Sequence, residues 1–115
     1  LLMLEVREGE KRLKELHLFL KGCWFDKIVA GEKNIEYREV AKWEKKLITR
    51  PGVSCHFDKE KCQYVFSKVA FPVILHRGYT SNVILKEIYK IKVVNGLETD
   101  LKVDKPVFAL YLREF

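Results

Sequence analysis

The side-chain types best suited to chemistry are concentrated in the octamer Gly31-Glu-Lys-Asn-Ile-Glu-Tyr-Arg38. If its second half is a β-strand, alternate residues share a face, so Glu36 and Arg38 point to the same side. The glycine turn at Gly31 brings Lys33 over that side. A carboxylate between two cations stays ionised and holds both in place, and the remaining edge of the guanidinium can bind a phosphate or a carbonyl. The same residues also fit an ordinary surface pair of Glu36 with Arg38, which contributes little to stability.

The three cysteines, Cys23, Cys55 and Cys62, are the second group of reactive side chains. An odd number cannot pair completely within one chain. The opening run Leu1–Leu4 is too short for a secretory signal, so we expect reduced thiols in a cytoplasmic protein. Cys55 and Cys62, even with His76 added, lack the close cysteine pairs typical of structural zinc sites. We therefore expect no bound metal and no other cofactor.

Length and charge limit the remaining possibilities. The chain has 115 residues, which predicts a single domain over 1–115 with residues 1–14 as a peripheral extension. With 22 basic and 16 acidic side chains, the net charge is +6, which favours a polyanionic partner such as nucleic acid. The excess is spread along the chain, so a lysine-rich surface of a soluble domain explains it equally well. No apolar run reaches the roughly 18 residues of a membrane span, and no Walker loop, nucleophile elbow, HExxH or dinucleotide motif is present.

The elements that must position the octamer follow from apolar periodicity. Helical spacing predicts short helices over 23–30 and 40–48, and alternation predicts strands over 16–20, 34–38, 64–66, 69–75, 83–94 and 107–112. Pro72 marks an edge, bend or bulge, while 53–63 shows no clear pattern. Tyr89 is expected on the same face as Ile91. The predicted core contains Leu18, Leu20, Phe25, Ile28, Ile91, Val93 and Leu110. This arrangement predicts an α+β fold, a small mixed β-barrel with two flanking helices.

Two segments resemble a known family. The octamer GEKNIEYR is similar to the GxKxxExR signature of the ASCH domain, a member of the PUA-like superfamily. The longer run LKGCWFDKIVAGEKNIEYR, from Leu20 to Arg38, resembles the strand, helix and glycine turn of that family. VAFPVILHRGYT, from Val69 to Thr80, resembles a second block in which a strand ends in an Arg-Gly-Tyr turn. Residues 1–14 and 50–63 resemble neither block.

The resemblance implies a PUA-like barrel with a cleft that holds RNA or a nucleotide-like ligand. Cations would bind phosphate, and Trp24 or Tyr79 would offer a ring on which a base stacks, although Trp24 also suits core packing. Arg77 and Tyr79, from the second block, are expected to approach the cleft from the facing side. The implied site residues are Lys21, Trp24, Gly31, Lys33, Glu36, Arg38, Arg77 and Tyr79.

Two alternatives remain open at this stage. Some ASCH-like proteins look similar to enzymes that remove an acyl group from the exocyclic nitrogen of cytidine with a lysine, a threonine and a glutamate. Lys33 matches the lysine, but Glu36 occupies the threonine position and cannot act as a hydroxyl nucleophile. A water-mediated amidohydrolase would use Glu36 as general base and Lys33 or Arg38 to stabilise the oxyanion. The second alternative is a regulatory domain that binds a protein partner and whose cleft is vestigial.

Overall fold

A computed structural model describes residues 15–115, so the predicted peripheral extension at 1–14 lies outside the described residues. Strands and helices alternate in the first half of the chain, and strands dominate the second half. In chain order the elements are β1 (Leu16–Leu20), α1 (Gly22–Val29), β2 (Ile35–Glu39), α2 (Val40–Ile48), β3 (Val53–Asp58), β4 (Gln63–Val69), β5 (Phe71–Arg77), β6 (Val83–Asn95), the 3₁₀ helix η1 (Gly96–Glu98) and β7 (Pro106–Glu114).

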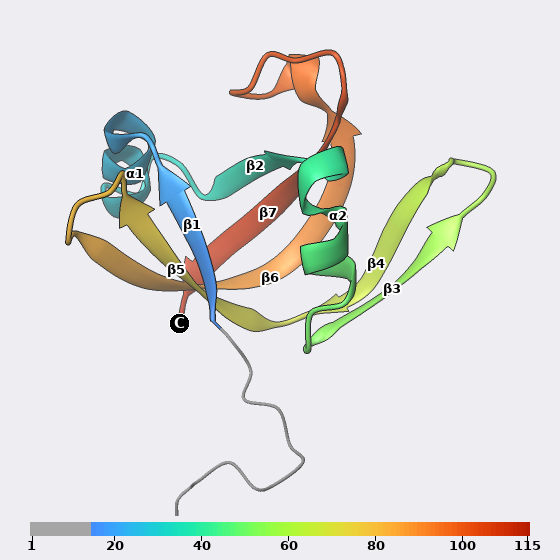
Figure 1. The fold of residues 1–115 in the computed structure, drawn as a ribbon, viewed down its shortest axis with the longest axis horizontal. Coiled ribbons are helices and arrows are strands. Elements are labelled where there is room, and N and C mark those ends of the chain that lie inside the picture. Colours follow the sequence, from blue (N-terminus) through green and yellow to red (C-terminus); the bar gives the residue numbers. More distant parts are fainter. Residues whose placement is uncertain (1–14) are drawn as a thin grey trace, which may run out of the picture.

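Five strands form one curled sheet in the order β1-β5-β6-β7-β2 (Figure 1). β1 and β5 run parallel, whereas the other neighbours are antiparallel, so the predicted mixed α+β architecture is confirmed. The sheet forms a half-barrel: β1 and β2 are its two edges and are not paired with each other. A gap therefore separates the first and second strands of the chain, and the candidate site lies there.

The two helices begin and end within one residue of the predicted bounds. α1 buries Phe25 and Ile28 against the sheet, and α2 buries Leu47. After α1 the chain turns at Gly31, whose φ of +80° lies in the left-handed region that glycine adopts without strain. This turn leads directly into β2, which carries the second half of the octamer.

The core follows the alternation read from the sequence. In β1 the three leucines are buried, while His17 and Phe19 between them are exposed. Of the predicted core, Leu18, Leu20, Phe25, Ile28, Ile91 and Leu110 are buried, and Val93 is half-buried and packs against them. Packing of α1 and of the inner sheet face into one cluster therefore positions the octamer.

A β-bulge in β6 changes one prediction. The pairing of β6 with β7 shifts between Ile88 and Lys90, so Tyr89 is an extra residue with no partner opposite. Ile88 and Ile91 both face the core as a result, although they are three residues apart. Tyr89 instead contacts Tyr111 on the outer face, with ring centroids 6.2 Å apart. The expectation that Tyr89 shares the face of Ile91 is wrong, because simple alternation ends at the bulge.

The unassigned segment 53–63 supplies β3 and the turn of an antiparallel hairpin with β4. This hairpin extends away from the half-barrel (Figure 1). The Tyr64 hydroxyl donates to Glu44 of α2 at 2.7 Å and so attaches the hairpin to the helix. Pro72 immediately precedes Val73, the first residue of β5 that pairs with β1. Pro72 therefore has no β1 partner among the described residues, which agrees with the expectation that a proline lies at an edge of the sheet.

Candidate functional site

A cavity of about 340 Å³ opens between the edges β1 and β2 and is called the cleft below. Glu36 and Arg38 line it from β2, Lys21 lines it from the end of β1, and each helix contributes one tryptophan. The connection between β6 and β7 adds Asp100 and Leu101. The cleft therefore collects residues from both edges of the sheet, from both helices and from one distant loop.

Strand pairing explains why two charged side chains face the interior. Glu36 lies opposite Leu110 and Arg38 lies opposite Phe108 in the β2–β7 ladder. Residues directly opposite each other in an antiparallel pair share a face, and both β7 residues are fully buried. Glu36 is only 7% exposed. The prediction that Glu36 and Arg38 share one face is confirmed.

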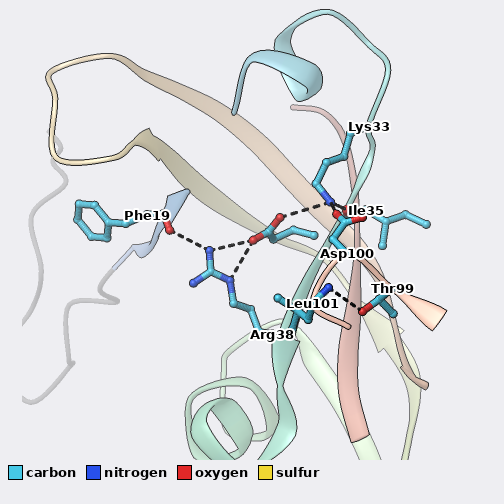
Figure 2. A network of polar contacts seen from close by, with 8 residues as sticks. Phe19, Lys33, Ile35, Arg38, Thr99, Asp100 and Leu101 are labelled. Carbon is cyan, nitrogen blue, oxygen red and sulfur yellow. Dashed lines mark hydrogen bonds and ion pairs between the residues drawn. The ribbon is translucent and has the colours of Figure 1, made fainter. Parts of the chain in front are cut away.

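Arg38 joins the two edges of the half-barrel (Figure 2). Its Nε and Nη2 lie 3.1 and 3.0 Å from Oε2 of Glu36, and Nη2 also donates to the Phe19 carbonyl at 3.1 Å. That carbonyl is on the unpaired edge of β1, where a backbone acceptor needs a partner. Within residues 15–115, Nη1 has no hydrogen-bond partner. The guanidinium is thus held on two sides and keeps one donor edge open.

Lys33 completes a network around Glu36. Its ammonium lies 3.6 Å from Oε1 of Glu36 and donates both to Asp100 and to the Ile35 carbonyl (Figure 2). The side chain of Lys33 is 9% exposed. It lines a smaller neighbouring cavity of about 240 Å³ rather than the cleft itself, because its ammonium points toward the loop that carries Asp100. The turn at Gly31 therefore delivers Lys33 to Glu36 but not to the main opening.

Sequence reasoning missed Asp100, which lies 67 residues from Lys33 in the chain. Its loop is held by Thr99, a buried residue whose hydroxyl donates to the Gly96 carbonyl and accepts from the Leu101 amide. A threonine followed by an aspartate after a turn is a common loop pattern. No local signal in the sequence links it to the octamer.

The electrostatics of Glu36 combine opposing effects. Burial raises the pKa of Glu36 above its ordinary value, and the charges of Arg38 and Lys33 oppose that rise. The nearby charge of Asp100 adds a small upward contribution to the same pKa. Glu36 is buried, and its side chain is as little exposed as that of Lys33, at 9% each. Its position inside the sheet therefore depends on the two cations that contact it.

Two tryptophans form walls of the cleft. Trp24 of α1 and Trp43 of α2 are half-buried and pack against the core, and both line the opening. The Arg38 guanidinium carbon lies 5.2 Å from the Trp43 ring centroid, and the Lys33 ammonium lies 5.5 Å from that of Trp24. Both readings of Trp24, as a packing residue and as a cleft residue, are thus realised in one side chain.

Arg77 is not brought to the cleft. Its Nε and Nη2 donate to the two carboxylate oxygens of Asp26 at 3.0 and 2.9 Å. The guanidinium lies over Gly22, where an added Cβ would be 2.8 Å from the Arg77 guanidinium carbon. Arg77 therefore connects β5 to α1, and the expectation that it faces the octamer across the cleft is wrong.

Tyr79 also lies outside the cleft, although it contacts a residue of the lip. The side chain is 93% exposed, and its ring stacks on Phe19 with centroids 5.2 Å apart. Phe19 itself lines the cleft. Of the eight predicted site residues, four line the cleft: Lys21, Trp24, Glu36 and Arg38. Lys33 contacts Glu36 from beside the cleft, and Gly31 forms the turn before β2. Arg77 pairs with Asp26 elsewhere, and Tyr79 contacts only Phe19 at the outer edge of the cleft.

The three thiols are unpaired, with Cys23 and Cys62 exposed and Cys55 half-buried. Burial raises the pKa of Cys55. Within the described part of the chain, no three histidine, cysteine or acidic side chains are grouped as a metal site would require. Nor does any helix in residues 15–115 have both the length and the apolar character needed to cross a membrane.

Comparisons with known proteins give no relative. No family model, curated protein or solved structure matches the chain. The likeness to the ASCH signature therefore remains a prediction.

Proposed function

We propose that the chain is an ASCH-like, PUA-like domain of the cytoplasm whose cleft binds a nucleotide or single-stranded RNA. The observation that carries this proposal is the arrangement of Arg38. It is fixed by Glu36 and by the Phe19 carbonyl, one donor edge stays open, and two tryptophans line the same cleft. Each part of that arrangement matches a part of a nucleotide.

The fixed guanidinium suits a phosphate or a base carbonyl. Guanidinium donors are planar and paired, so they bind such oxygens with defined geometry. Because Arg38 is already immobilised, little side-chain entropy is lost when a ligand binds. The side chain is 17% exposed, so the open edge is shielded from much of the solvent that would compete for it.

The tryptophans suit a base. Indole rings offer large flat surfaces on which any base can stack, and such stacking is typical of single-stranded nucleic acid recognition. The volume of about 340 Å³ lies within the range of roughly 300–1,000 Å³ found for small-molecule sites. One base and its sugar are a reasonable content for a cleft of this size.

Exposed lysines at the mouth suit the phosphate backbone. Lys21 lines the cleft from the end of β1 and forms no ion pair with any residue of 15–115. Lys42 lines it from α2, is 72% exposed and lies 4.0 Å from Glu39. Both cations can approach a phosphate without breaking a buried contact.

The contacts of the network support binding better than amide hydrolysis. The Lys33 ammonium already contacts Asp100, Ile35 and Glu36, so its donors are occupied. Both oxygens of Glu36 face cations, and a general base would have to leave one of them. Hydrolysis would therefore need the network to open before a substrate could react.

Intrinsic fluorescence tests the proposal without a label, because both tryptophans of the chain line the cleft. Titration with a mixture of the four ribonucleoside monophosphates, or with short RNA, should change the emission of the wild-type protein. Arg38→Ala should need at least about tenfold more ligand for the same change, since a charge-assisted hydrogen bond contributes about 1.5–3 kcal/mol. Lys59→Ala, on the hairpin away from the cleft, should behave as wild type. A wild-type emission spectrum that neither ligand alters would contradict the proposal.

A further inference from the structure

The outer face of β1, β5 and β6 carries uncharged side chains that the core does not use. Strand pairing aligns them in two rows across the three strands, Phe19–His76–Val83 and His17–Ile74–Leu85. Phe19, Val83 and Leu85 expose between 44% and 49% of their surfaces. A contiguous exposed apolar patch on a sheet face commonly marks a binding surface.

Four of the rings on this face form a continuous series, which is called the aromatic stack below. The ring centroids of His17 and His76 are 5.0 Å apart, those of His76 and Phe19 are 4.2 Å apart, and those of Phe19 and Tyr79 are 5.2 Å apart. The His76, Phe19 and Tyr79 rings are stacked, with interplanar angles of 18° and 25°. Nδ1 of His17 lies 2.8 Å from Nε2 of His76, which fixes the far end of the series.

Tyr79 is presented to solvent by a well-bonded turn. The Gly78 amide donates to the Leu20 carbonyl at 2.7 Å, and the Thr80 hydroxyl donates to the Arg77 carbonyl at 2.6 Å. At 93% exposure, Tyr79 adds almost nothing to the core. One face of its ring contacts Phe19, and the other is open. A rigid turn that holds an aromatic ring in this way offers a preformed surface for another flat ring.

Phe19 connects the aromatic stack to the cleft. Its carbonyl accepts from Arg38 at the edge of the cleft (Figure 2), and its ring belongs to the aromatic stack on the outer face. Lys21, one of the two exposed lysines at the cleft mouth, follows two residues later. A strand of nucleotides that leaves the cleft beside Lys21 would meet Phe19 and then Tyr79.

We propose that the aromatic stack is a second base-binding surface, so that the ligand is single-stranded RNA of several nucleotides and not a mononucleotide. This inference rests on the proposed function of the cleft. One base occupies the cleft, a phosphate lies near Lys21, and the next base stacks on Tyr79. Glu15 lies 3.7 Å from His17 at the far end, so the bases approach from the Tyr79 end, away from this carboxylate.

Ring chemistry favours bases over a second copy of the chain. Obligate interfaces between identical subunits are strongly hydrophobic and resemble a protein core cut in half. Here the exposed series consists of three ring types, two of which carry polar atoms, and it begins at the edge of the cleft that Lys21 and Arg38 line. Such a surface stacks well with heteroaromatic rings, whose own edges remain hydrated.

Ligand length provides the test. Fluorescence titrations would compare the mixture of four ribonucleoside monophosphates with random-sequence RNAs of three and six nucleotides. For the six-nucleotide RNA, Tyr79→Ala should weaken binding by about 5- to 150-fold, because stacking on one aromatic side chain contributes roughly that factor per base. Affinity for the monophosphates should not change. Tyr79→Phe should keep the wild-type affinity for both. Phe57→Ala is the matched control, since Phe57 is 48% exposed but lies on the β3–β4 hairpin.

The outcomes separate the two proposals. If the monophosphates bind and Tyr79→Ala binds the six-nucleotide RNA as tightly as wild type, the second surface is refuted while the cleft proposal stands. If no ligand of any length binds the wild-type protein, both proposals fail. The aromatic stack could instead bind a second copy of the chain, and sedimentation of the unliganded protein tests this. A wild-type dimer that Tyr79→Ala converts to a monomer would assign the aromatic stack to self-association and overturn the inference.

Discussion

Glu36 is a charged residue on the core face of a strand, and its neighbours explain how that position is tolerated. Transfer of a lone carboxylate into the protein interior is very unfavourable unless opposite charges and hydrogen bonds compensate it. Here Arg38 contacts one oxygen at 3.0 Å, and Lys33 lies 3.6 Å from the other. The cations are themselves held by Phe19 and Asp100. The network is therefore a unit, and a change in one member affects the others.

The pKa of Glu36 provides the first prediction. Burial raises this pKa, and the Arg38 charge is the largest effect that opposes the rise. Arg38→Ala should therefore move the pKa of Glu36 further upward, and carbon NMR of the side-chain carboxyl can follow it. Because a raised pKa means that the folded protein holds the proton more tightly than the unfolded chain, the contribution of Glu36 to stability should increase as the pH falls through that pKa. A lower pKa in the variant would contradict the prediction.

The stability of the network gives the second prediction. Arg38→Ala removes the bonds to Glu36 and leaves the Phe19 carbonyl without its donor, so the free energy of unfolding should fall by about 1–3 kcal/mol. Arg113→Ala is the matched control, because Arg113 pairs with Glu87 on the surface and is 56% exposed. Arg113→Ala should lower the free energy of unfolding by less than about 1 kcal/mol. Urea unfolding measures both variants, and equal losses would show that burial of the Arg38 contacts contributes nothing.

Among the individual residues of the site, the sequence predicted the positions that depend on local geometry. Strand alternation placed Glu36 and Arg38 on one face because side chains in a strand repeat every second residue. It could not reveal Asp100, whose partner is 67 residues away, or the pairing of Arg77 with Asp26. Contacts between distant segments depend on how the sheet curls, which no local pattern encodes.

At the scale of elements, α1 holds one wall of the cleft. The helix has eight residues, and its N-cap Lys21 makes no side-chain capping bond. A helix this short is marginal in isolation, so packing against the sheet must stabilise it. Phe25 and Ile28 supply that packing, and Trp24 beside them lines the cleft. The position of Trp24 therefore depends on the buried side of the same helix.

Two neighbouring residues of α1 allow a matched test. Ile28 is 3% exposed and Val29 is 58% exposed. Ile28→Ala should lower the free energy of unfolding by about 2–5 kcal/mol, because it removes buried methyl groups and leaves a cavity. Val29→Ala removes a similar part of an exposed side chain and should change stability by less than about 0.5 kcal/mol. Thermal or urea unfolding that ranks Val29→Ala as the more damaging change would refute the placement of the helix.

Element bounds were predictable where periodicity is regular and not where it is interrupted. Both helices and β1 follow clean apolar patterns, and their bounds agree within one residue. β6 contains a bulge at Tyr89 that changes the facing of every later residue, and nothing in its sequence marks the site. β3 of the hairpin carries mixed side chains and buries none of them, so its sequence lacked the apolar alternation that identifies a half-buried strand.

For the whole molecule, the open side of the half-barrel is the feature that matters most. The edges β1 and β2 are connected by Arg38 rather than by strand pairing, and the space beside that link forms the cleft. Six of the seven strands, the two helices and the basic charge could be predicted from the sequence, whereas β3 could not. The gap could not, since closure of a sheet depends on the sum of small twists along five strands.

The salt dependence of RNA binding tests the proposed function most directly. Affinity for a short single-stranded RNA would be measured at roughly 50 and 200 mM salt for wild type, Lys21→Ala and Arg38→Ala, with Lys59→Ala as control. Wild-type affinity should fall as salt rises, because bound phosphates release counterions. Lys21→Ala should reduce the slope of log affinity against log salt by about one, and Arg38→Ala should bind more weakly at both concentrations. A wild-type affinity that does not depend on salt, or an Arg38→Ala variant that binds as tightly as wild type, would contradict nucleic-acid binding by this cleft.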